Sequence, residues 1–103
     1  MKFTDFNLSP DILSTVVTAG FETPSPIQEL TIPLALEGKD VIGQAQTGTG
    51  KTAAFGLPTL NKIDTANNNV QALVIAPTRE LAVQSQEELF RFGRDKGVKV
   101  RSV

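Results

Sequence analysis

The Gly-rich segment at residues 45–52 restricts the folding of this chain more than any other feature of its sequence. Its eight residues read Ala-Gln-Thr-Gly-Thr-Gly-Lys-Thr. The apolar pair Val41 and Ile42 stands just before it, and the apolar residues of 53–57 follow it. A short buried strand, a tight loop and a helix beginning near Gly50 are therefore predicted in that order.

This order of elements is typical of a loop that holds phosphate groups. Successive backbone N–H groups and the positive end of the following helix attract phosphate oxygens, Lys51 adds a cation, and Thr52 offers a hydroxyl to Mg²⁺. We predict that the phosphates contact Gln46, Thr47, Gly48, Thr49, Gly50, Lys51 and Thr52. Lys51 and Thr52 are the predicted catalytic residues, and Thr52 is also the predicted metal ligand. Ala45 departs from the common pattern, which begins with Gly. The alternative is a Gly-rich turn with an incidental Lys-Thr pair.

Two helices are predicted before this loop. Ser9-Pro10 and Ser25-Pro26 each place a favoured N-cap residue before a proline in the first helical position. Apolar residues then recur at helical spacing in both segments, until Gly20 and Gly38 supply stop signals. Pro33 is expected to bend the second helix.

Two further strands and a helix are predicted after the loop. Residues 71–76 form a continuous apolar run closed by Pro77, as expected for a strand buried on both faces of a parallel sheet. Thr78 can cap a helix with apolar positions at helical spacing up to Gly93, and residues 98–102 then alternate between apolar and polar. Pro58 is expected to kink the helix that follows the Gly-rich loop.

The predicted fold class is α/β, with parallel strands and flanking helices. A chain of 103 residues has room for one domain at most. We predict two parts within it: helices at 1–38, and βαβ units at 39–103 that end after about the third strand. Such a length is about half of what a complete sheet of five or more strands requires.

Composition excludes several classes of function. The sequence has no Cys and no His, so disulfides and zinc sites are excluded and only Asp and Glu remain as strong side-chain metal ligands. A formal charge of -1 gives no general attraction to nucleic acid. No signal peptide or membrane span is apparent, which predicts a cytoplasmic protein without membrane contact.

Three segments together resemble the DEAD-box RNA helicases. Residues 20–28, Gly-Phe-Glu-Thr-Pro-Ser-Pro-Ile-Gln, look like the family's Q motif, and Phe3 stands where the family has an isolated aromatic. Residues 45–52 look like its motif I, in which Ala at the first position is usual, and residues 77–81 look like motif Ia. The resemblance implies a partial RecA-like P-loop domain and, as cofactors, ATP with Mg²⁺.

The resemblance also implies an adenine site. Gln28 would read the adenine edge through its amide, which can pair with N6 and N7 together, and Phe3 would stack on the base. Gln28 has a second interpretation, because Ser25 and Gln28 have the spacing of a capping box. The two roles are compatible, since the amide oxygen and nitrogen can serve different partners.

Motif Ia implies sequence-independent contact with the RNA sugar–phosphate backbone. The residues assigned to it are Pro77, Thr78, Arg79 and Glu80. The alternative is that Thr78 merely caps a helix and Arg79 is a solvated first-turn residue. A basic stretch follows near the C-terminus, and we interpret it as an ordinary solvated face: Arg91, Arg94, Lys96, Lys99 and Arg101.

The sequence contains no Asp-Glu-Ala-Asp motif, and a second RecA-like domain is absent from this chain. Phosphoryl transfer depends on charge neutralisation at the γ-phosphate, so the fragment is predicted to be inactive alone. Unpaired strands further predict self-association. Two alternatives stay open: a fragment of another P-loop NTPase, such as a DNA helicase or a transporter ATPase, and a non-catalytic binding fragment.

Overall fold

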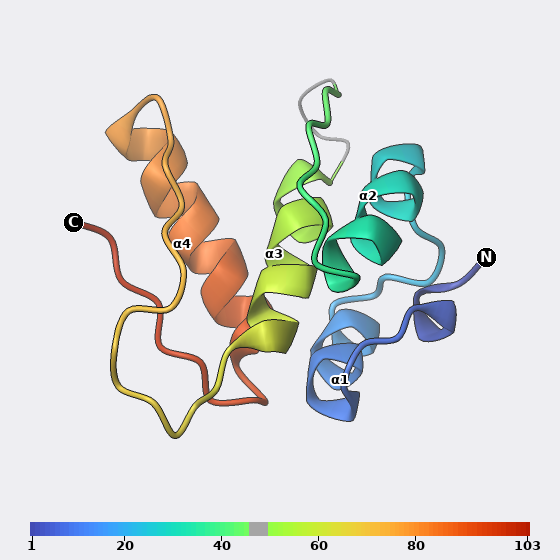
Figure 1. Ribbon diagram of the computed structural model, residues 1–103, viewed down its shortest axis with the longest axis horizontal. Coiled ribbons are helices and arrows are strands. Elements are labelled where there is room, and N and C mark those ends of the chain that lie inside the picture. The colour runs from blue at the N-terminus through green and yellow to red at the C-terminus, as the bar shows by residue number, and fades with distance from the viewer. Residues whose placement is uncertain (46–49) are drawn as a thin grey trace.

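A computed structural model describes residues 1–45 and 50–103 of the chain. The described residues form a short 3-10 turn, η1 (Phe3–Asp5), followed by the helices α1 (Pro10–Thr18), α2 (Pro26–Leu36), α3 (Lys51–Lys62) and α4 (Arg79–Gly93). In Figure 1, α3 lies centrally, with α4 on one side of it and α1 and α2 on the other.

Local signals set the ends of the first two helices, as predicted. Pro10 and Pro26 are the first helical residues, after Ser9 and Ser25 at the N-cap positions. At the C-terminal ends, Gly20 and Gly38 both have a φ of 87°, a left-handed conformation that glycine adopts without strain. In each case the next residue donates its N–H back to the last helical turn, as in a Schellman motif.

The core lies where α1, α2 and α4 meet α3. Gly56 allows α3 and α4 to pack closely, because a Cβ at this position would come within 2.5 Å of Leu89 Cδ2. The Thr15 hydroxyl on α1 donates to the Phe92 carbonyl on α4 at 2.6 Å, inside the core. The buried apolar cluster consists of Phe3, Phe6, Leu8, Ile12, Val16, Ile32, Ala53, Leu57, Leu60, Leu89, Phe92 and Val98.

Two lysine side chains join helix ends across the structure. Lys96 Nζ donates to the carbonyls of Leu60 and Asn61 at 2.9 and 2.7 Å, at the C-terminal end of α3. Lys62 Nζ donates to the Ala35 carbonyl of α2 at 2.8 Å. Cations at helix C-termini satisfy free carbonyls and oppose the helix dipole. Lys96 is therefore a helix cap, and not only part of a solvated basic stretch as predicted.

The three predicted strands are not formed within the described residues, so the prediction of parallel strands is not confirmed there. Residues 40–45, 71–76 and 98–103 have no helical or strand assignment, although the helices around them are in place. A strand is stable only when neighbouring strands accept its hydrogen bonds and other layers cover its faces. Here Ile42 is 97% exposed and Ile75 is 86% exposed. The apolar runs therefore lack the sheet that their sequences favour.

The remaining predictions about the helices are confirmed in part. Both α2 and α3 continue past their internal prolines, Pro33 and Pro58, to Leu36 and Lys62. On α4, Leu89 and Phe92 are buried as the helical spacing indicates, but Leu81 is 44% exposed. The first half of that helix lacks the sheet against which it would pack. No helix in the described ranges is long and apolar enough to cross a membrane.

Candidate nucleotide and RNA sites

The start of α3 has the geometry expected of a phosphate-binding helix end. Gly50 is its N-cap residue, with φ 84° and ψ 31° in the left-handed region, and Lys51 is the first helical residue. Gly50 has no side chain with which to cap this end. The N–H groups of the first turn have no acceptor within the helix, so they are available to an anion.

Gln28 joins the start of α2 to the start of α3. Its Oε1 accepts the backbone N–H of Ser25 at 2.8 Å, which is half of the predicted capping box. Its Nε2 donates to the Gly50 carbonyl at 3.2 Å, across 22 residues of sequence. The side chain is buried, with 5% exposure. Gln28 and the end of the predicted phosphate loop are thus in direct contact.

Two other residues predicted to bind phosphate lie at this helix end. Lys51 is exposed and Thr52 is half-buried, both in the first turn of α3. Gln46, Thr47, Gly48 and Thr49 lie outside the described residues. No group of three or more Asp or Glu residues in the described ranges could hold a metal ion. Magnesium binding at Thr52 stays a prediction.

Ser25 borders the same site, although the sequence indicated only an N-cap role for it. A Cβ at Gly50 would stand 3.6 Å from Ser25 Oγ and would collide with Gln28 Nε2. The capping-box spacing of Ser25 and Gln28 was the available signal. It places the two side chains next to each other, so a group that contacts Gln28 also lies near Ser25. Only glycine, which has no Cβ, fits at position 50 without this collision.

Phe3 belongs to an aromatic cluster at the N-terminal side of α1. Its ring is 2% exposed, stacks on Phe21 at a centroid distance of 5.7 Å, and meets Phe6 edge-on at the same distance. Its backbone N–H donates to the Glu22 carbonyl at 3.1 Å. Phe21 in turn contacts Phe92 at 5.6 Å. The ring is thus attached to the segment preceding Gln28, and its contact with adenine stays a prediction.

The residues predicted to bind RNA surround the start of α4. Thr78 is the N-cap residue, and its Oγ1 accepts the Leu81 N–H at 3.2 Å, as the helix-capping interpretation predicts. Arg79 and Glu80 are exposed in the first turn. A shallow hollow of about 370 Å³ lies here, lined by Ala76, Pro77, Thr78, Arg79, Ala82, Val83, Ser102 and Val103.

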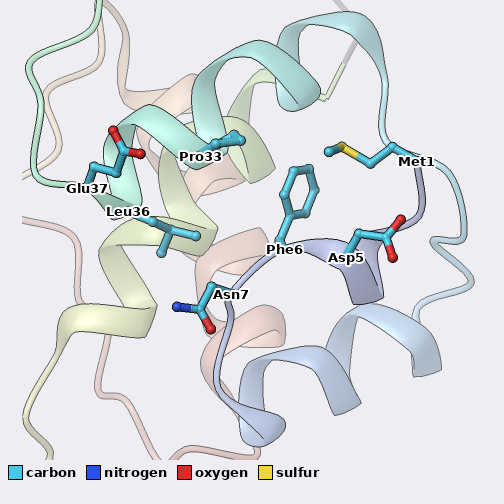
Figure 2. Close-up of a pocket in the computed structure, with 7 residues that line it drawn as sticks. All are labelled: Met1, Asp5, Phe6, Asn7, Pro33, Leu36 and Glu37. Carbon is cyan, nitrogen blue, oxygen red and sulfur yellow. The ribbon is translucent and has the colours of Figure 1, made fainter.

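A second hollow, of about 350 Å³, lies between the N-terminal segment and the second half of α2. Figure 2 shows its lining: Met1, Asp5, Phe6, Asn7, Pro33, Leu36 and Glu37. None of the residues predicted to bind ATP or RNA is among them. This hollow is therefore separate from both candidate sites, and the sequence contained no signal for it.

Known proteins resemble the whole of this chain. It is 79% identical over 103 residues to the DEAD-box ATP-dependent RNA helicase CshA of Streptococcus pneumoniae serotype 4 (strain ATCC BAA-334 / TIGR4), covering 100% of this chain and 20% of the relative. It is 61% identical over 100 residues to DEAD-box ATP-dependent RNA helicase CshA of Bacillus subtilis (strain 168), covering 97% of this chain and 20% of the relative. The chain thus spans about a fifth of these relatives.

Solved structures of DEAD box proteins share the arrangement of its helices. A DEAD box protein from Methanococcus jannaschii has a TM-score of 0.85 and 40% identity, over 90% of this chain and 26% of that protein. S. cerevisiae Dbp5 bound to RNA and ADP BeF3 has a TM-score of 0.87 and 38% identity, over 91% of this chain and 25% of that protein. The described fold therefore corresponds to part of the RecA-like domain of those proteins.

A sequence profile of the DEAD/DEAH box helicases matches residues 25–103, which include both Gln28 and the start of α3. The matched region covers well over half of the chain. With the relatives above, it disfavours the alternative of an unrelated P-loop NTPase. The chain belongs to the DEAD/DEAH box helicase family.

Proposed function

We propose that this chain is the N-terminal part of an ATP-dependent RNA helicase, in which it binds ATP with Mg²⁺ and supplies part of the RNA-binding surface. The observation that carries the proposal is the contact between Gln28 and Gly50. It brings the residue expected to recognise adenine to the helix end expected to hold the phosphates. One nucleotide can then touch both.

Gln28 retains capacity for a base in addition to its two internal hydrogen bonds. A glutamine amide has two N–H donors and two acceptor lone pairs, and each internal bond uses one of them. The second N–H can donate to adenine N7 while the second lone pair accepts from N6. Guanine presents an oxygen where adenine has N6, so the same amide favours ATP over GTP. Phe3 is proposed to supply the stacking contact, which requires a face of its ring, only 2% exposed in this structure, to become accessible to the base.

Nucleotide binding to wild type, Gln28→Glu and Gln86→Ala tests this role. The glutamate keeps an oxygen for the Ser25 N–H but loses both amide donors. Wild type should prefer ATP over GTP by about tenfold or more, since a bidentate base contact contributes about 1–3 kcal/mol of discrimination. Gln28→Glu should lose this preference. Gln86→Ala removes a glutamine amide on α4 that donates to the Val100 carbonyl, and this variant should keep the preference for ATP. A wild type without adenine preference would contradict the proposal.

The RNA contacts are proposed at Pro77, Thr78, Arg79 and Glu80. The hollow at the start of α4 and the exposed Arg79 support this assignment, because free N–H groups and a cation suit phosphate oxygens. Such contacts are independent of base sequence. Arg79→Ala should weaken binding to all single-stranded RNA sequences alike, which fluorescence anisotropy at low salt measures. A sequence-dependent loss would argue against backbone contacts. A cytoplasmic location is part of the same proposal.

Alone, the 103-residue chain should bind nucleotide without turning it over. Residues 1–103 contain no Asp-Glu-Ala-Asp motif to hold Mg²⁺ and position the attacking water. A steady-state ATPase assay with RNA should show no turnover above background. Turnover near the level of a complete helicase would refute this. In a longer protein, residues 40–44, 71–76 and 98–102 are proposed to become parallel strands beside neighbours from the rest of the domain.

A further inference from the structure

Gly43 lies against α2, just before the predicted phosphate loop of residues 45–52. A Cβ at position 43 would stand 3.0 Å from Ile27 Cδ1 and 3.4 Å from Thr31 Cγ2, both on the first half of α2. In Figure 1 the segment that leaves α2 turns back beside that helix. Gly43 does not have a positive φ, so a left-handed backbone does not explain the glycine. The close approach to α2 does.

The surface that Gly43 meets on α2 has a defined shape. The Thr31 hydroxyl donates to the Ile27 carbonyl, one helical turn earlier, at 2.7 Å. This bond holds the Thr31 side chain in one rotamer, with its methyl carbon toward residue 43. Ile27 and Thr31 are both half-buried and share one face of the helix. A side chain at position 43 must therefore displace them or move the chain away from α2.

The same part of α2 also holds the far end of the loop. Gln28, the neighbour of Ile27, donates to the Gly50 carbonyl at 3.2 Å. The helix α2 thus contacts the chain at residue 43, before the loop, and at residue 50, where α3 begins. A binding segment whose two ends are already fixed loses less conformational freedom when it takes up a ligand.

We propose that Gly43 is a positioning residue for the phosphates of the nucleotide, because its missing side chain lets α2 set where the phosphate loop begins relative to α3. Gly43 does not itself touch the nucleotide. This inference rests on the proposed nucleotide site and adds Ile27 and Thr31 to it as a support. A larger residue at position 43 should shift the loop entrance and weaken the phosphate contacts, while the adenine contact of Gln28 stays.

NMR titration of the chain with ATP and with adenosine separates these two effects. Adenosine has no phosphates, so the ratio of the two affinities reports the phosphate contacts, whereas a general structural defect would weaken both ligands alike. Gly43→Val should lower this ratio by about tenfold or more and change adenosine affinity by less than about twofold. Gly43→Ala should give an intermediate ratio, because it adds only the Cβ and the end of the Ile27 side chain can yield.

A second background tests whether α2 is the cause. Ile27→Ala removes the side chain that the valine would strike, so in this background Gly43→Val should lower the ratio by only about threefold or less. Ile42→Val is the matched control, since it places the same side chain one position earlier, where the residue is 97% exposed. It should keep the wild-type ratio. Urea unfolding of each variant verifies that it is folded.

Three results would overturn the positioning role of Gly43 while leaving the nucleotide site intact. They are an unchanged ratio in Gly43→Val, an equal loss of ATP and adenosine affinity, and the same loss of ratio with Ile27 or alanine at position 27. Wild type that binds ATP no more tightly than adenosine would be a different result. It would contradict phosphate binding itself, and the role of Gly43 with it.

Discussion

Replacing Gly50 with alanine should destabilise the chain through two separable effects. The first is backbone strain, because Gly50 has a φ of 84° and an L-residue in this region costs about 1–2 kcal/mol. The second is a collision, because the new Cβ would overlap Gln28 Nε2. The amide cannot turn away freely, since its Oε1 is held by the Ser25 N–H. Losing the bond from Nε2 to the Gly50 carbonyl costs about another 1 kcal/mol.

The predicted loss in the free energy of unfolding is therefore about 2–3 kcal/mol. With a urea dependence of about 1–1.5 kcal/mol per molar for a small domain, the unfolding midpoint should fall by about 2 M. Urea unfolding followed by far-UV circular dichroism measures it. Gly20→Ala is the matched control: Gly20 has a φ of 87°, but a Cβ there meets nothing within 4 Å. It should lose only the strain, about 1–2 kcal/mol, and so less than Gly50→Ala.

A double-mutant cycle tests whether the collision is the cause. Replacing Gln28 by alanine removes the side chain that the new Cβ would strike, so Gly50→Ala should cost less in that background. The coupling energy between the two positions should be about 1 kcal/mol, within the range for residues in contact. Equal losses in Gly50→Ala and Gly20→Ala, or additive effects in the cycle, would refute the contact between Gln28 and the start of α3.

Three further substitutions test the packing around α3, each by urea unfolding. Thr15→Val should cost about 1–2 kcal/mol, because the buried Phe92 carbonyl loses its donor. Thr15→Ser keeps the hydroxyl and should retain most of this stability. An equal loss in the two variants would contradict the role of the Thr15 hydroxyl as donor. Leu57→Ala should cost about 2–5 kcal/mol, since Leu57 is 0% exposed; a loss below about 1 kcal/mol would exclude a packed core at this position. Lys96→Met should cost about 1 kcal/mol by uncapping α3. Lys39→Met, which breaks only an exposed ion pair, should change stability by less than about 0.5 kcal/mol.

The helices of this chain were predictable because their signals are local. Prolines at the first helical position and glycines just past the end determine a boundary through backbone sterics within a few residues. Pro10, Pro26, Gly20 and Gly38 accordingly mark the observed ends. Thr78 is confirmed as the N-cap of α4 for the same reason. The capping box at Gln28 is likewise a short-range pattern.

Features that depend on distant residues could not be predicted in this way. An apolar run such as 71–76 shows that a strand is favoured, but pairing requires partners that sequence periodicity does not identify. Phe3 is a similar case, because its ring packs on Phe21, which belongs to a different segment of the chain. Lys96 resembled a solvated residue until its carbonyl partners on α3 were known. In each case, the missing information is tertiary.

The two candidate sites differ in how far they depend on contacts between distant residues. The nucleotide residues stand at the starts of α2 and α3, and those helices are positioned by direct packing in the buried core. Gln28 then fixes the distance between the two helix starts. The RNA residues instead begin α4 directly after the unpaired run 71–76, with Leu81 still exposed. Their position depends on a strand that the described chain does not form. Gln28 and the start of α3, proposed to contact adenine and phosphate, are therefore better preorganised in this chain than the proposed RNA surface.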